Sequence, residues 1–133
     1  DLILLDIKHF DSIAHKKLVG MSMQGIRDFI NIVGNRNVKV WIRHVMVPTM
    51  TDSQGHMDAM YKITKKIRHL IERFEILPYH KLGIEKYQEL GIEYALAGIE
   101  EMNTEIAKGY EQELNDRLKL EKENTGGLKK HAV

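Results

Sequence analysis

The sequence lacks cysteine altogether, and it lacks an excess of charge of either sign. Without cysteine, the chain can form no disulfide and offers no thiolate as a nucleophile or as a metal ligand. Its 20 Lys and Arg residues balance 19 Asp and Glu residues, which leaves a formal net charge of +1. Such a chain has no global field to attract nucleic acid or an acidic membrane, so we expect neither as a partner.

Long apolar runs are missing as well. No segment approaches the roughly 20 apolar residues that span a bilayer, and no signal-peptide pattern opens the chain. We therefore expect a cytoplasmic protein. Residues 1–8 already have the pattern of a strand, as expected of a chain cut from a longer one. With 133 residues and 43% hydrophobic content, the chain can bury one core.

Three short segments rich in Val, Ile, Leu and aromatic residues predict buried strands at about 2–8, 38–47 and 74–79. Their apolar residues run almost continuously rather than in strict alternation, which is typical of strands covered on both faces. Helical segments separate the strands along the chain, and the first is expected at 11–18. This alternation predicts an α/β fold in which helices cover a parallel sheet.

Apolar residues spaced three and four apart predict further helices over 23–33 and about 53–71. A charged helix is expected after the third strand, from about Asn103 onward. We expect one folded unit over 1–123 and a disordered tail over 124–133.

Polar residues stand at the end of each predicted strand, where parallel α/β proteins bind their ligands. Asp6 and Lys8 share one face of the first strand, and Arg43 and His80 lie on or just after the second and third. Lys8 and Arg43 can oppose a carboxylate, while Asp6 can accept from an ammonium group or hold a cation. His80 can bond a hydroxyl. A small zwitterion suits this set, but a structural ion pair of Asp6 and Lys8 fits the pattern equally well.

The other histidines give a weaker signal. His44 is expected to point away from Arg43 and to pack as a structural side chain. The remaining histidines show no metal-ligand spacing, so we interpret them as structural or exposed.

Three blocks of sequence follow one another in a specific order: LLDIK at 4–8 with HKKLVGMS at 15–22, then VWIRHVMVP at 40–48, then LPYHKLG at 77–83. Together they resemble the family of pyruvate formate-lyase activating enzymes, which are radical SAM activases of glycyl radical enzymes. The likeness covers about three quarters of the chain, as far as Gly98.

The resemblance implies the C-terminal half of a partial (β/α)6, TIM-like radical SAM barrel, built from three β/α units. In this family, S-adenosylmethionine bound to a 4Fe-4S cluster is cleaved reductively, and a glycyl radical forms on pyruvate formate-lyase. The cluster is held by a CxxxCxxC motif, which this cysteine-free chain lacks. The glycine-rich segment that binds the amine of S-adenosylmethionine is missing too. We therefore expect the chain alone to be inactive.

The resemblance also implies roles for individual residues. Contacts to S-adenosylmethionine are implied for Asp6, Lys8, Arg43, Val45 and His80. A monovalent-cation site is implied at the Leu4 carbonyl and Asp6. No catalytic residue is implied in this part of the family's sequence.

The implied partners are pyruvate formate-lyase and an electron donor such as flavodoxin. Two alternatives remain open: an activase of another glycyl radical enzyme, such as anaerobic ribonucleotide reductase, or a non-catalytic binding module built on a truncated barrel. One departure from the family pattern concerns residues 97–102, where many members carry a proline pair. The approach to the last helix therefore differs from the family.

Overall fold

A computed structural model of the chain describes residues 1–9, 16, 20, 22–81, 84–91 and 96–131. The helix expected at 11–18 lies outside these residues, apart from position 16. The described part contains a parallel sheet in the order β1-β2-β3. Its strands are β1 (Leu2–Asp6), β2 (Lys39–Met46) and β3 (Ile71–Pro78). The expected α/β class with a parallel sheet is confirmed.

The third strand begins earlier than its apolar pattern indicated. We expected it from Phe74, but β3 starts at Ile71. The register passes from Val40 paired with Ile71 to Trp41 paired with Arg73, so Glu72 is an extra residue at an irregularity in the ladder. That irregularity interrupts the apolar run and hides the start of the strand.

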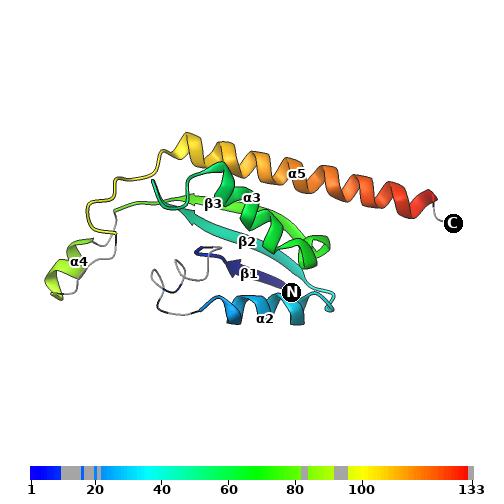
Figure 1. Cartoon of the computed structure of the whole chain (residues 1–133), viewed down its shortest axis with the longest axis horizontal. Coiled ribbons are helices and arrows are strands. Elements are labelled where there is room, and N and C mark those ends of the chain that lie inside the picture. The colour runs from blue at the N-terminus through cyan, green and yellow to red at the C-terminus, as the bar shows by residue number, and fades with distance from the viewer. Residues whose placement is uncertain (10–15, 17–19, 21, 82–83, 92–95, 132–133) are drawn as a thin grey trace.

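Helices connect and follow the strands (Figure 1). They are α2 (Gln24–Val33), α3 (Gln54–Ile63), the 3-10 helix η1 (Lys65–Leu70), α4 (Ile84–Glu89) and α5 (Thr104–His131). Of the two residues before α3 that could cap it, Asp52 and Ser53, the cap is Ser53, whose side chain accepts a hydrogen bond from the His56 amide. No helix in the described ranges has both the length and the apolar character needed to cross a bilayer.

The two faces of the sheet are different. Along β2, side chains at alternate positions are buried, and those between them are partly or fully exposed. The buried face packs against apolar residues of α2, α3, η1 and α5, which form a single core: Ile30, Val33, Met57, Met60, Ile67, Ala107, Leu114 and Leu118. We call the other face, which carries Arg43, the open face. The continuous apolar strands had suggested cover on both faces, so this half-covered sheet differs from that expectation within the described chain.

Side chains of α5 satisfy the outer edge of β3. The Asn115 amide accepts from the Phe74 backbone N–H at 2.8 Å and donates to the Phe74 carbonyl at 2.9 Å. Glu111 accepts from the Ile76 N–H at 2.8 Å. In this way α5 takes the place of a further strand at this edge.

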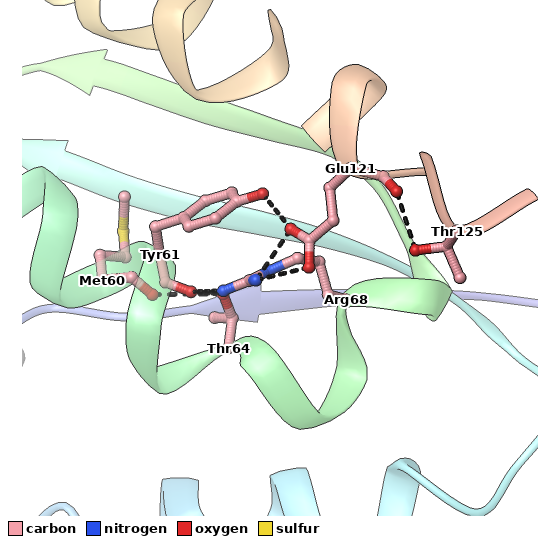
Figure 2. Close-up of polar contacts among 6 residues, drawn as sticks. All are labelled: Met60, Tyr61, Thr64, Arg68, Glu121 and Thr125. Carbon is pink, nitrogen blue, oxygen red and sulfur yellow. Dashed lines mark hydrogen bonds and ion pairs between the residues drawn. The ribbon is translucent and has the colours of Figure 1, made fainter. Parts of the chain in front are cut away.

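A second set of contacts fixes α5 to the end of α3 (Figure 2). Arg68 of η1 donates to both carboxylate oxygens of Glu121 at 2.8 Å, and its guanidinium lies 3.8 Å from the centre of the Tyr61 ring. The Tyr61 hydroxyl also donates to Glu121. Burial, reinforced by this bond, raises the pKa of Tyr61 to about 12. Figure 2 shows how Glu121 reaches down from α5 to meet both partners.

The last helix is longer than expected. α5 continues to His131 and so passes position 123, where we had placed the end of the folded unit. Within the helix, the Thr125 hydroxyl donates to the Glu121 carbonyl at 2.8 Å. Figure 1 shows that the final turns extend beyond the sheet. The backbone therefore has no break at 123, and whether 124–133 is disordered stays a prediction.

Candidate functional site

A row of alternating charges crosses the open face of the sheet. Asp6, Arg43 and Glu75 are direct register partners on the three strands. The Arg43 Nε lies 3.8 Å from Asp6 Oδ1 and 3.6 Å from Glu75 Oε2. The Lys8 ammonium lies 3.4 Å from Asp6 Oδ2. Three residues predicted from strand-end positions, namely Asp6, Lys8 and Arg43, are thus brought together.

The row extends further on β3 than the sequence indicated. Glu75 also lies 3.6 Å from the Arg73 Nη2, and the Arg73 guanidinium lies 4.6 Å from the centre of the Trp41 ring. We missed Arg73 because the predicted strand began at Phe74, and Glu75 because it stands inside that strand and not at its end. The signal was present in the alternation of Arg73 and Glu75 with buried Phe74 and Ile76. The full row holds three cations and two carboxylates, which leaves one positive charge in excess.

The two carboxylates beside Arg43 both approach its guanidinium at Nε. Its Nε is buried and has no hydrogen bond, because both neighbouring carboxylates lie beyond the usual 2.7–3.2 Å range. Both ion pairs join these carboxylates to Nε, and the two terminal nitrogens donate no hydrogen bond to a described residue. A guanidinium with a free terminal fork can take a carboxylate in a bidentate manner. The excess charge and the free fork together suit an amino-acid carboxylate.

Val45 and Leu4 complete the apolar part of the open face. Val45 follows Arg43 by two positions and is half-buried opposite Leu77. Leu4 is 51% exposed and pairs with Trp41. The described residues contain no group of three or more His, Asp or Glu side chains that could hold a metal ion. The cation site at the Leu4 carbonyl and Asp6 therefore stays a prediction.

His80 is placed differently from its predicted partners. It lies two residues beyond the end of β3, and its side chain is 49% exposed. Its Nδ1 lies 4.0 Å from Glu101 Oε2, in the segment that precedes α5. The described contacts of His80 are therefore to Glu101 and not to the charged row.

His44 lies on the covered face, directly behind the row. Its Nδ1 is 2.7 Å from the Ile7 carbonyl, so this nitrogen must carry the proton, and the buried Nε2 is left without a partner among described residues. Burial, with help from nearby cationic groups, lowers the pKa of His44 to about 4. The expectation of a packing histidine that points away from Arg43 is confirmed. Because Ile7 lies between Asp6 and Lys8, this bond also fixes the end of β1.

Comparison with known proteins found relatives named pyruvate formate-lyase-activating enzyme. No family model matches the chain. The pyruvate formate-lyase-activating enzyme of Clostridium pasteurianum is 48% identical over 118 residues, which are 89% of this chain and 49% of that protein. The enzyme of the same name from Staphylococcus aureus (strain USA300) is 40% identical over 122 residues, or 90% of this chain and 47% of that protein. The chain spans about half the length of the curated relatives it matches.

A solved structure shares the fold. It is the crystal structure of a domain of pyruvate-formate lyase-activating enzyme from Bacteroides vulgatus ATCC 8482. The TM-score is 0.63 at 17% identity, and the match covers 88% of this chain and 62% of that one. At this identity the likeness shows the fold alone, and it fits half of a partial barrel. Along about nine tenths of its length, the chain is homologous to the pyruvate formate-lyase-activating enzymes, as the order of its motif blocks predicted.

Proposed function

We propose that this chain supplies part of an activase that generates a glycyl radical on pyruvate formate-lyase. The observation that carries the proposal is the 48% identity, over 89% of the chain, to a protein named for that activity. The charged row on the open face supports it, because the row offers what an amino-acid ligand needs. Activase activity, substrate and partners are proposed for the whole protein, of which the chain represents about half.

The ligand proposed for the open face is S-adenosylmethionine. When bound together with a 4Fe-4S cluster, it supplies the hydrogen-abstracting chemistry of such activases. Lys8 and the free fork of Arg43 oppose its carboxylate, and Asp6 accepts from its ammonium group. Val45 flanks the ligand as an apolar contact. His80 is proposed to bond a ligand hydroxyl, and Asp6 with the Leu4 carbonyl is proposed to hold a monovalent cation.

The residues present do not fit the cluster itself. An iron–sulfur cluster needs thiolate ligands, and the chain contains no cysteine. We propose that these ligands come from the half of the relatives' sequence that the match does not cover. The chain alone is accordingly predicted to be inactive and to bind S-adenosylmethionine weakly or not at all.

The remaining assignments are also proposals. The protein partner is pyruvate formate-lyase, a flavodoxin serves as electron donor, and the complete protein works in the cytoplasm. The residues after His80, which include α4, are proposed to contribute to the choice between pyruvate formate-lyase and another glycyl radical enzyme.

A chimera tests the proposal. This chain replaces the matched 118 residues of the Clostridium pasteurianum enzyme, and the product is reconstituted anaerobically with iron, sulfide and reductant. We expect a glycyl radical signal on pyruvate formate-lyase by electron paramagnetic resonance, with the unmodified enzyme as the positive control. A chimera that folds and carries its cluster but neither binds nor cleaves S-adenosylmethionine would support a non-catalytic module instead. Cleavage without a radical on pyruvate formate-lyase would favour another glycyl radical enzyme as partner.

A further inference from the structure

We propose that Glu75 is a positioning residue that holds Arg43 for the ligand carboxylate, an inference that rests on the proposed function of the open face. Glu75 is the direct register partner of Arg43 across β2 and β3. Its Oε2 lies 3.6 Å from the Arg43 Nε. The Glu75 side chain is only 26% exposed, less than either Asp6 or Lys8. It is thus the most sheltered carboxylate of the row.

The geometry of the guanidinium gives Glu75 its role. Arginine presents five N–H donors in a rigid plane, so a partner on the Nε side orients the terminal fork without occupying it. Asp6 and Glu75 both approach Arg43 through Nε, from opposite neighbouring strands. The terminal nitrogens therefore stay available for a ligand.

Asp6 cannot hold Arg43 alone once a ligand is bound. Its carboxylate already meets the Lys8 ammonium at 3.4 Å, and the proposed ligand ammonium would compete for the same oxygens. Glu75 has a different second partner, Arg73, at 3.6 Å through its other oxygen. Arg73 in turn is fixed against the face of Trp41. Glu75 can therefore keep its place when Asp6 turns to the ligand.

Glu72 provides a matched control on the same strand. It too is a glutamate of β3, but its carboxylate meets Lys39 at 3.0 Å and Trp41 at 3.3 Å, away from Arg43. Glu72→Gln and Glu75→Gln each remove one negative charge from β3, three positions apart. A merely structural carboxylate would give the two variants the same phenotype.

The first measurement uses the 133-residue chain without any cofactor. Two-dimensional nuclear magnetic resonance spectra follow the Arg43 Nε–Hε signal, which is assigned from its loss in Arg43→Lys. We expect Glu75→Gln to shift this signal and to speed its hydrogen exchange, while Glu72→Gln leaves it in place. Denaturation curves of both variants check that the sheet is intact. An unchanged Arg43 signal in folded Glu75→Gln would overturn the proposal.

The second measurement uses the chimera with the Clostridium pasteurianum enzyme and follows S-adenosylmethionine binding. Both ion pairs of Glu75 are partly exposed, so we expect Glu75→Gln to weaken binding by about three- to tenfold. Glu72→Gln should bind normally, and Glu75→Asp should recover part of the loss. Equal affinity in Glu75→Gln and Glu72→Gln would overturn the positioning role. If the unsubstituted chimera binds no S-adenosylmethionine, the proposed function fails, and the Arg43 spectrum alone decides the role of Glu75.

Discussion

The two faces of strand β2 differ in the burial and in the charge of their side chains. On the covered face, Val40, Ile42 and Met46 are completely buried, and burial lowers the pKa of His44 between them to about 4. On the open face, Arg43 and its neighbours form a charged row that remains partly accessible. The covered face excludes water and stabilises the fold, whereas the open face carries partly accessible ion pairs with one positive charge in excess. One strand therefore contributes to packing on one face and, in our proposal, to ligand recognition on the other.

The largest difference is expected between truncation of a leucine in the core and truncation of a leucine on the open face. Leu114 of α5 is 1% exposed, whereas Leu4 is 51% exposed. Leu114→Ala leaves a cavity in the core and should lower the free energy of unfolding by about 3 kcal/mol. Leu4→Ala truncates a half-exposed side chain outside the core, and a change of about 0.5 kcal/mol or less is expected. Urea denaturation measures both, and equal losses would show that the open face is a second core.

The covered face should also respond to acid through His44. The folded chain keeps this imidazole neutral down to about pH 4, whereas the unfolded chain protonates it near its ordinary pKa of 6.5. The unfolded state therefore binds more protons as the pH falls from 6.5 to 4, and stability is lost in this window by about 3 kcal/mol.

The His44→Asn variant isolates this contribution. Its free energy of unfolding should fall less steeply between pH 6.5 and pH 4 than that of the native chain, whatever the variant's stability at pH 7. Denaturant titrations at several pH values provide the two slopes. Parallel slopes would mean that His44 is protonated in the folded chain.

The edge of β3 should be sensitive to the loss of Asn115. Asn115→Ala removes both hydrogen bonds to the Phe74 backbone. The Phe74 N–H and C=O then lose these partners, which should lower the free energy of unfolding by about 2 kcal/mol. Gln112 serves as the control, because its side chain bonds to Asp116 on the exposed side of the same helix and to no other residue that the structure describes. Gln112→Ala should change stability by about 0.5 kcal/mol or less. Similar losses in the two variants would contradict the edge-capping role of α5.

The smallest effect concerns the end of α5. Residues 124–131 continue the helix, and its final turns extend beyond the sheet, so we expect their helical form to depend mainly on local hydrogen bonds. We expect their amides to exchange with solvent much faster than those near Ala107, Leu114 and Leu118, which are buried. Hydrogen-exchange mass spectrometry would measure the difference. Equal protection along α5 would show that the tail belongs to the folded unit.

The sequence predicted the fold and part of the site for identifiable reasons. Strand-end positions and the period of two placed Asp6, Lys8 and Arg43 on one face, because these rules depend only on local backbone geometry. The irregularity at Glu72 is a tertiary feature, so it concealed Arg73, whereas Glu75 was passed over because it lies inside the strand and not at its end. His80 lies beyond the strand, where no periodicity fixes the direction of a side chain. Its contact with Glu101 depends on how the segment before α5 returns to the sheet.

The half-covered sheet also has a cause that local rules do not contain. Apolar residues such as Leu4 suggested cover on both sides, yet Leu4 is half exposed in the described structure. The chain spans about half the length of the curated relatives it matches, and we propose that the other half supplies the cover for this face.

The most direct test of the open face as a ligand site is the affinity of the chimera for S-adenosylmethionine with and without Arg43. Arg43→Ala removes the free fork, and we expect binding to weaken by about 10- to 100-fold. The exposed Arg36, which follows α2, serves as the charge-matched control, and Arg36→Ala should bind normally. Isothermal titration measures both variants. Native affinity in a folded Arg43→Ala chimera would contradict the assignment of the charged row as the carboxylate site.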